Sequence, residues 1–315
     1  MLYQVFNGEQ EKKISRFGGI ESGGTKIVCA VGTKPEDLRD EFRFSTTTPA
    51  ETIETIIDYF KKQDKKEKLS ALGIGSFGPV DLDKESPTYG YITSTPKTKW
   101  QNTNFYGKIK EAFDIPIEFD TDVNAAALGE HEWGAARNLA NFIYITIGTG
   151  IGGGGIINGD SLHGLLHPEM GHIFVPHNKT EDPFEGTCPF HKDCFEGLAS
   201  GTAIRARWGK KGETLEANHP AWNLEAKYIS LAVINYICTL SPEKIILGGG
   251  VMKQKQMLPL IQKRVKTLLN NYIKAPEITN HINQYIVLPE LGDDAGVLGA
   301  IALAKRAYEK KNKSG

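Results

Sequence analysis

The sequence is poor in cysteine, has no excess of either charge and contains no long apolar run. Only four of its 315 residues are cysteine, and 37 Lys and Arg balance 38 Asp and Glu for a net charge of −1. This balance gives no basic surface for nucleic acid or an anionic membrane. No run reaches the about 18 apolar residues of a membrane span, and the amino terminus lacks a secretion signal's apolar core. We therefore expect a cytoplasmic protein whose partners are small molecules.

The few cysteines fall into two groups. Cys29 lies in an apolar strand pattern and Cys238 in a helical one, so both are expected to be buried and reduced. The other two stand in CPFHKDC, which places Cys188, His191 and Cys194 three residues apart. Thiolate and imidazole at this spacing favour a tetrahedral zinc site that needs one more ligand from elsewhere. A disulfide or a pair of buried thiols is the alternative.

What the chain has in abundance is glycine beside apolar strand patterns, in an α/β order. Residues 17–32 predict two strands around a glycine turn, residues 49–63 an amphipathic helix, and residues 71–76 a further strand. The pattern returns at residues 141–159, where ITIGTGIGGGGII again predicts strand, glycine turn and strand. The two halves therefore predict an internal duplication, with two glycine turns able to hold one polyphosphate. Either turn alone could be an ordinary tight turn.

Two nucleotide-binding motifs match only in spacing. Gly148, Gly150 and Gly153 satisfy GxGxxG, but a strand and turn follow where a dinucleotide site needs a helix. Gly19 and Gly24 have the spacing of a P-loop, but Thr-Lys follows in the wrong order and leads into a strand. The sequence therefore predicts neither a dinucleotide-binding fold nor a P-loop.

Seven stretches together carry a resemblance. In chain order they are GGIESGGTK, GSFGPVDL, DTDVNAAALGE, ITIGTGIGGGGII, HPEMGH, CPFHKDCFE and LGGGV. They resemble the ROK family of sugar kinases, above all its zinc-containing fructokinase branch, over about residues 17–305. The resemblance implies a two-domain α/β fold of the actin and hexokinase type (ribonuclease H-like), with the substrates in the cleft between the domains. It also implies a homodimer.

The same resemblance implies the domain limits. The smaller α/β domain is expected to comprise residues 17–120 and the carboxyl-terminal residues 297–315. Residues 121–296 are expected to form the larger domain, which carries the zinc loop. Residues 1–16 are polar and uneven in composition, and we expect them to form a disordered leader.

The resemblance assigns the phosphate chemistry as well. Asp122 matches the catalytic base that accepts the proton of the attacking sugar hydroxyl. The alternative is that Asp122 only caps the following helix, and Asp120 is less suited because the motif places the base two residues before Asn124. Glu21 stands where the family usually has Asp and could reach Mg²⁺ through water. The residues expected to bind ATP are Gly23, Gly24, Thr25, Lys26, Gly148, Thr149, Gly150, Gly248, Gly249 and Gly250.

The resemblance also supplies the sugar and metal sites. The residues expected to bind the sugar are Gly78, Pro79, Asn124, Glu169, His172 and Glu196. His172 is also the implied fourth zinc ligand, beside Cys188, His191 and Cys194. Four protein ligands leave no open position, so the zinc is expected to be structural and to hold the two sugar-binding glutamates together. His163, His167 and His177 are alternatives to His172.

The expected reaction follows from these assignments. An ATP- and Mg²⁺-dependent kinase would phosphorylate the 6-hydroxyl of fructose. Glucose, mannose and N-acylated hexosamines are alternative substrates, because epimers are distinguished by fine placement that a sequence does not reveal. A sugar-responsive repressor would need a DNA-binding domain before the first glycine turn, for which about twenty residues are too few. A sugar-binding protein without catalysis is a third possibility, which the presence of Asp122 disfavours.

Overall fold

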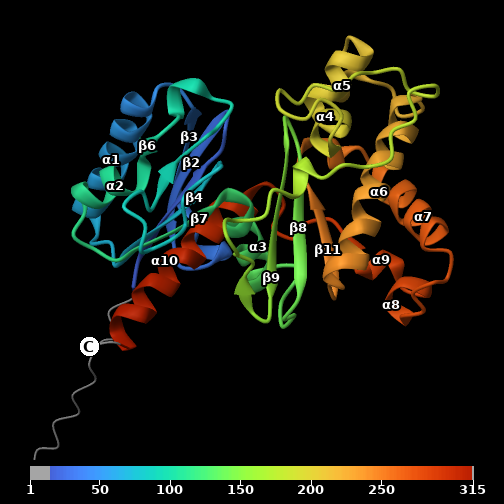
Figure 1. The fold of residues 1–315 in the computed structure, drawn as a ribbon. Coiled ribbons are helices and arrows are strands. Elements are labelled where there is room, and N and C mark those ends of the chain that lie inside the picture. The colour runs from blue at the N-terminus through green and yellow to red at the C-terminus, as the bar shows by residue number, and fades with distance from the viewer. Residues whose placement is uncertain (1–14, 314–315) are drawn as a thin grey trace, which may run out of the picture.

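The computed structural model describes residues 15–313 and contains two five-stranded sheets, each in its own lobe (Figure 1). The first lobe is built on a sheet of strand order β3-β2-β1-β4-β7. Its strands are β1 (Phe17–Ser22), β2 (Lys26–Gly32), β3 (Arg39–Ser45), β4 (Ala71–Ser76) and β7 (Ile117–Thr121). The first three strands pair antiparallel, and β1, β4 and β7 run parallel.

The second sheet repeats this plan. Its order is β10-β9-β8-β11-β12, so each sheet begins with an antiparallel hairpin and adds two parallel strands on the far side. The strands are β8 (Phe142–Ile147), β9 (Ile151–Ile157), β10 (Asp160–Ser161), β11 (Lys244–Gly248) and β12 (Ile286–Val287). The two sheets share one connectivity, which confirms the internal duplication. The carboxyl ends of their parallel strands are where such folds place ligands.

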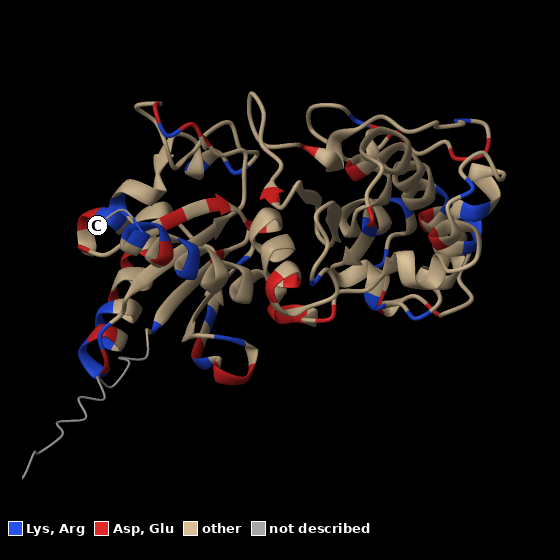
Figure 2. Ribbon diagram, turned by 90° about the horizontal axis from the view of Figure 1, so that it is seen from below, with Lys and Arg blue, Asp and Glu red and all other residues tan. Residues whose placement is uncertain are grey.

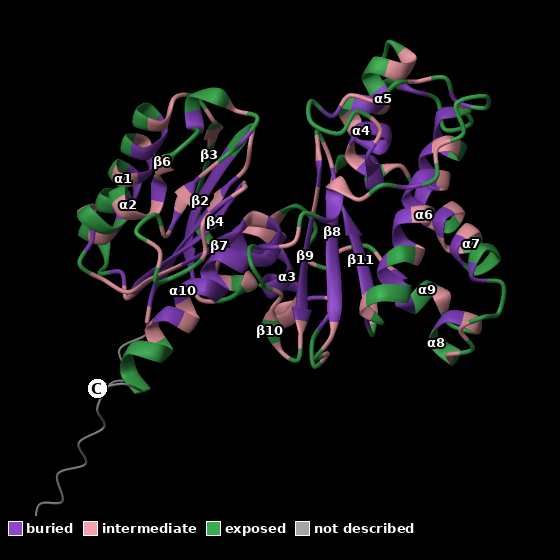
Figure 3. Cartoon of the chain, in the orientation of Figure 1, coloured by how far each residue is buried: buried purple, intermediate pink, exposed green. Residues whose placement is uncertain are grey.

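Helices cover both sheets. In the first lobe they are α1 (Pro49–Lys66), α2 (Phe105–Ala112) and α10 (Ala295–Lys313), with the short pair β5 (Tyr91–Ile92) and β6 (Thr103–Asn104) in a connecting loop. In the second lobe they are α4 (Phe195–Ala199), α5 (Gly201–Trp208), α6 (Ala221–Leu240), α7 (Met257–Leu269), α8 (Pro276–Thr279) and α9 (Ile282–Tyr285). Figure 3 shows β8, β9 and β11 largely buried, while the outer turns of the helices are exposed.

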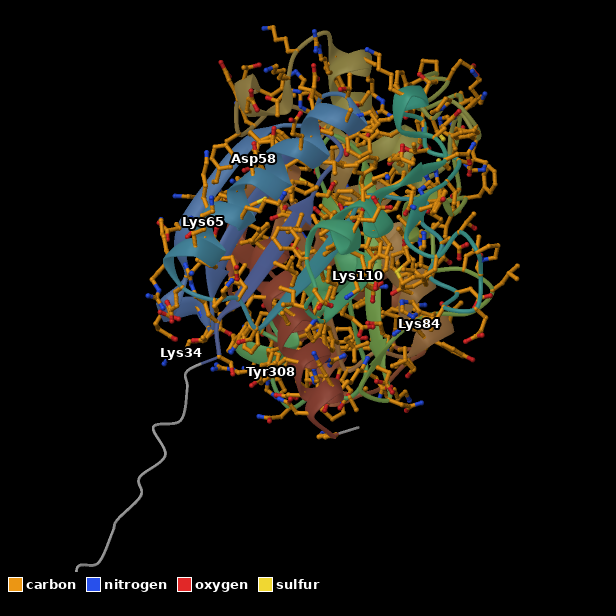
Figure 4. All side chains as sticks on the ribbon, turned by 90° about the vertical axis from the view of Figure 1, so that its left-hand side faces the viewer. Lys34, Asp58, Lys65, Lys84, Lys110 and Tyr308 are labelled. Atoms are coloured by element: carbon orange, nitrogen blue, oxygen red, sulfur yellow. The ribbon has the colours of Figure 1, made fainter. Side chains whose placement is uncertain are left out.

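The predicted amphipathic helix is α1. It begins with a capping box between Thr48 and Glu51. Proline occupies the first helical position, where a backbone N–H would have no partner within the helix. The apolar spacing predicts one face with Ile53, Ile56, Ile57 and Phe60; Ile53, Ile56 and Phe60 are buried, and Ile57 is partly buried against the same core. On the opposite face Asp58 and Lys65 project into solvent (Figure 4). Acidic and basic residues are distributed over both lobes (Figure 2), in keeping with the near-zero net charge.

Helix α3 (Asp122–Trp133) joins the lobes. It contacts β4 and β7 of the first sheet, β8 and β9 of the second, and α10. Small residues allow the helices to approach closely, because a Cβ on Gly299 of α10 would overlap the carbonyl of Ala125 of α3. Small residues of α10 therefore permit tight packing of this helix on α3. Because α3 contacts both sheets, the proposed domain limits at residues 120/121 and 296/297 stay a prediction.

The structure bears on two further expectations, the amino-terminal leader and the burial of Cys29 and Cys238. Most of the predicted leader, residues 1–14, lies outside the described residues, but Arg16 is buried and donates to the carbonyls of Gln63 (3.0 Å) and Glu67 (2.9 Å). Cys29 is buried as expected, whereas the prediction for Cys238 is wrong, since this residue is exposed on α6. Within residues 15–313, no helix combines the length and apolar character that a bilayer crossing requires.

Candidate active site

A cavity of about 640 Å³ lies between the lobes. Residues from the carboxyl ends of both sheets line it, together with the loops that follow them. Predicted site residues from widely separated stretches meet there, namely Gly24, Thr25, Gly78, Pro79, Asp122, Gly148, Thr149, Gly150, Glu169, His172, His191 and Glu196. One cleft therefore brings together the expected base, both glycine turns and the sugar-site carboxylates.

Asp122 is the first residue of α3 and faces this cavity. The helix is capped by its neighbour, since Thr121 Oγ1 accepts from the amide of Asn124 at 3.1 Å. The Asp122 carboxylate accepts from the adjacent Val123 amide at 2.9 Å. Burial raises the pKa of Asp122 to about 6, against the opposing effect of that amide. With capping done by Thr121, the carboxylate is free to act as a proton acceptor in the cleft.

Each glycine turn is closed by a backbone hydrogen bond, across four residues in the first turn and three in the second. The amide of Gly23 donates to the carbonyl of Lys26 at 2.9 Å, and the amide of Gly148 donates to that of Gly150 at 2.9 Å. In the first turn Gly24 and Thr25 line the cavity, whereas Gly23 and Lys26 do not. Turns of this kind present backbone amides and a threonine hydroxyl to an anion.

A second cavity of about 370 Å³ continues from the second glycine turn, because Gly148 and Thr149 line both. In the third predicted glycine loop, Gly248 to Gly250, only Gly250 lines this second cavity. Gly249 has φ +89°, and a Cβ there would lie 2.5 Å from the carbonyl oxygen of Ile147, so this glycine serves backbone packing. Gly248 packs in the same way against Tyr144.

Sequence reasoning missed the other side of the second cavity. Thr202 and Arg205 of α5 line it, together with Lys211 after the end of that helix and Gln254 from a later segment. Ser200 could have indicated a helix start here from the sequence, because serine is a favoured helix cap. In the structure its hydroxyl accepts from the amide of Ala203. A capped helix start beside a glycine turn supplies further amides for an anion.

The sugar-site carboxylates lie near one another. Burial, followed by the proximity of Glu196 and Asp122, raises the pKa of Glu169 to about 7. Glu196 accepts from the amide of Ile151 at 2.8 Å, so it is fixed to the second glycine turn. Asn124 is different, because it is 1% exposed and absent from the cavity lining. Its amide donates to Asp120 at 2.7 Å, which makes it a support for the strand end rather than a group that faces the cleft.

Glu21 is the last residue but one of β1, just before the first glycine turn, and it is not among the residues that line the cavity. Its Oε2 is buried without a hydrogen-bond partner among the described residues. Burial raises its pKa to about 7, with Lys26 acting in the opposite direction and Asp122 in the same one. An unsatisfied buried carboxylate oxygen is costly unless something binds it, so Glu21 fits a group that reaches a cation through water.

Four side chains converge at the predicted metal site. Nδ1 of His172 lies 3.6 Å from Sγ of Cys194 and 3.7 Å from Sγ of Cys188, which is 3.7 Å from Nδ1 of His191. All four candidate ligand atoms lie within 4.8 Å of one another. Zinc bonds of about 2.0 to 2.3 Å give a tetrahedron with edges of about 3.5 Å. The two thiols form no disulfide.

The alternative histidines are engaged elsewhere. Nε2 of His163 lies 3.1 Å from Asp120 Oδ1, and Nε2 of His167 accepts from the amide of Val80 at 3.1 Å. His177 pairs with Asp193 at 3.0 Å. Of the four histidines considered as the fourth ligand, His172 is therefore the one that lies in the cluster. Its Nε2 faces the other way, 4.0 Å from Oε1 of Glu196, so one ring can serve both the metal and the cavity.

A buried charge network supports the loop that carries this cluster. Arg207 of α5, whose side chain is 7% exposed, binds Asp182 at 3.2 Å and approaches Glu225 at 3.5 Å. Tyr228 donates to Asp182 at 2.6 Å, and the guanidinium lies 4.2 Å from the ring centre of Phe184. Burial raises the pKa of Glu225 to about 8, with Arg207 opposing the shift. The network fixes residues 182–184 against α5 and α6.

Arg207→Ala is therefore expected to destabilise the protein by about 3 to 5 kcal/mol, because it leaves two buried carboxyl groups without their cation. Urea unfolding followed by circular dichroism measures the change. Lys210→Ala, at an exposed position just after the same helix, is the control and should leave stability within about 0.5 kcal/mol. Equal stability of the two variants would contradict a structural role for the network.

Comparisons with known proteins agree with this architecture. The model of the ROK family matches residues 17–307. A fructokinase of Lactococcus lactis subsp. cremoris is 48% identical over 94% of this chain and 99% of its own length. A fructokinase of Streptococcus mutans is 46% identical over 92% and 97%. The crystal structure of a ROK hexokinase from Thermus thermophilus superimposes with a TM-score of 0.74, at 25% identity over 95% of this chain and 100% of that one, which confirms the predicted two-domain fold. The chain belongs to the ROK family.

Proposed function

We propose that the protein is an ATP-dependent fructokinase that transfers the γ-phosphate to the 6-hydroxyl of fructose. The single observation that carries this proposal is that Asp122 lines one cleft together with the sugar-site carboxylates and the two glycine turns. The fructokinase relatives, similar over nearly the whole chain, support the same substrate.

In the proposed reaction, Asp122 accepts the proton of the sugar hydroxyl as its oxygen attacks the γ-phosphorus. Glu169, Glu196 and Nε2 of His172 orient the sugar through its other hydroxyls. Because phosphoryl transfer has a loose transition state, correct placement and charge neutralisation supply most of the rate. Closure of the lobes excludes water, which would otherwise compete as the acceptor.

The nucleotide would extend from the cleft into the second cavity. The turns at Gly24–Thr25 and Gly148–Gly150 hold the phosphates, and the second cavity, with Gly250, takes the ribose and adenine. Glu21 is the residue of this chain that would reach a Mg²⁺ ion bound with ATP, through water, and such an ion would neutralise phosphate charge.

The donor set of the metal cluster fits zinc. His172, Cys188, His191 and Cys194 supply two nitrogens and two sulfurs, the complement of a closed structural site. Zinc there would hold the loop of residues 188–196 to the segment that carries His172. The two sugar-site carboxylates would then keep their separation, since Glu196 follows Cys194 and Glu169 precedes His172.

The pKa of Asp122 predicts the acid limb of the pH profile. Its value is raised from 3.8 to about 6, so Asp122 takes up a proton as the pH falls through about 6 and can no longer act as base. We expect this protonation alone to lower kcat/KM for fructose about tenfold per pH unit below this value. Glu169, with a pKa of about 7, adds a second step that Glu169→Gln should remove. A profile that stays flat as the pH crosses 6 would contradict Asp122 as the base.

A coupled assay for ADP with Mg-ATP and a panel of fructose, glucose, mannose and N-acetylated hexosamines tests the substrate. We expect the highest kcat/KM with fructose. A clear preference for another hexose would replace the substrate while keeping the reaction, and sugar binding without ADP release would favour a non-catalytic binding protein. The expected homodimer is measured on the same sample by analytical ultracentrifugation.

A further inference from the structure

The segment from Leu162 to Glu169 crosses from the second lobe to the first. It begins directly after β10, and it ends at the carboxylate proposed to bind the sugar. Apolar burial does not hold its middle, since Leu165 is 99% exposed and Leu166 is 58% exposed. On either side of these leucines stands a histidine, His163 or His167, and each contacts a residue of the first lobe.

The contact made by His167 lies in the wall of the cleft. His167 is buried, and its Nε2 accepts from the amide of Val80 at 3.1 Å. A Cβ placed on Gly78 would lie 3.3 Å from Cε1 of this ring, so the imidazole packs directly on the loop expected to contact the sugar. On its other side, Nδ1 lies 3.7 Å from Oε1 of Glu169. His167 therefore stands between two parts of the sugar site, one from each lobe.

The contact made by His163 lies just before the start of α3, the helix that begins with Asp122. Nε2 of His163 lies 3.1 Å from Oδ1 of Asp120, the last residue but one of β7. Asp120 is buried, and the same oxygen accepts from the amide of Thr121 at 2.8 Å and from Asn124 at 2.7 Å. His163 thus binds a rigid point two residues before Asp122.

We propose that His163 and His167 form a two-point clamp between the lobes that positions Glu169 for the sugar, with His167 as the principal positioning residue. The clamp rests on the proposed sugar site. Neither histidine needs to touch the reacting atoms. Their contribution is to fix the distance between Glu169, the Gly78–Val80 loop and the start of α3, so that sugar hydroxyls meet all three at once.

The two contacts require different proton arrangements. His167 must keep Nε2 unprotonated to accept from Val80, and burial lowers its pKa, in the direction that the contact needs. His163 must carry a proton on Nε2 to donate to Asp120, and this hydrogen bond raises its pKa. The titratable groups that face His167 are Glu169, Asp120 and His163. A neutral His167 and a proton-donating His163 coexist near neutral pH, where the clamp is expected to be complete.

His167→Leu tests the clamp, because leucine fills a similar space but cannot accept from Val80. We expect the KM for fructose to rise about tenfold or more while the KM for Mg-ATP changes less than about twofold. His167→Gln should recover most of the affinity, since its amide oxygen can reach the place of Nε2. His163→Leu should raise the same constant, and the double variant should lose less than the product of the two single effects, because both act on one segment.

His281→Leu, an exposed histidine in the second lobe, is the matched control and should behave as wild type. Thermal unfolding of each variant shows that it is folded. The proposal is overturned if folded His167→Leu keeps the wild-type fructose KM, if both KM values rise together, or if His167→Gln is as impaired as His167→Leu. If the wild type prefers another hexose, the fructose assignment fails, and the same comparison is made with that hexose. If the wild type turns over no hexose, calorimetry measures the dissociation constant of the sugar for each variant, and the ratios of these constants replace the ratios of KM.

Discussion

Asp122→Asn is expected to lower kcat with fructose by about 10² to 10⁴, the usual contribution of a positioned general base. Asparagine has nearly the same shape and can still accept from the Val123 amide through its carbonyl, so the start of α3 should be unchanged. Thr121 continues to cap the helix. The KM values for fructose and Mg-ATP should therefore stay within about threefold of wild type, because the lost interaction is made only in the transition state.

Steady-state kinetics and calorimetric sugar binding on the same preparation separate the two effects. Asp120→Asn is the informative comparison, since Asp120 stands two residues away but is 3% exposed and hydrogen-bonded to Thr121, Asn124 and His163. It should affect fructose binding more than kcat. Normal turnover in Asp122→Asn would remove Asp122 from the role of base, and a larger loss of kcat in Asp120→Asn would transfer that role.

Cys188→Ser is expected to empty the metal cluster and to weaken fructose binding about tenfold or more. Serine is a poor zinc ligand, and metal binding and folding of such a loop are coupled. Cys188 Sγ is within 3.7 Å of both histidines of the cluster, so its loss affects His172, whose Nε2 faces the cavity. The KM for Mg-ATP should change less, because none of the four cluster residues lines the second cavity, where the ribose and adenine are proposed to bind.

Cys238→Ser is the matched control for this experiment, because Cys238 is exposed on α6 and outside the cluster. Elemental analysis should find about one zinc per chain in wild type and in Cys238→Ser, and much less in Cys188→Ser. A full complement of metal in Cys188→Ser would refute the ligand set. Loss of metal with an unchanged fructose KM would refute its connection to the sugar site.

Local patterns were sufficient to predict much of the fold. The repeated strand–glycine–strand stretches predicted both hairpins, and the apolar spacing of Ile53, Ile56 and Phe60 predicted the buried face of α1. Position on an element is harder to predict when a helix is apolar on most sides. Cys238 shows this, since α6 is rich in buried residues but turns this thiol to solvent.

The candidate site was predictable where a short motif carries the geometry, and not where distant segments meet. CPFHKDC brings three ligands together in sequence, but Arg205 of α5, Lys211 after that helix and the distant Gln254 reach the second cavity from separate parts of the chain. Asn124 follows Asp122 closely in sequence, yet the turn of the helix buries it against β9, where Gly154 leaves room for its side chain. The sequence offered His167 only as an alternative zinc ligand, and its contact with Val80 was not predictable, because the partner is a backbone amide 87 residues away.

The most direct test of the central claim is the identity of the product. Incubation with Mg-ATP and fructose, followed by phosphorus and carbon NMR, should show ADP and fructose 6-phosphate in equal amounts for wild type and almost none for Asp122→Asn. Phosphate on a different hydroxyl, or undiminished product from Asp122→Asn, would contradict the account.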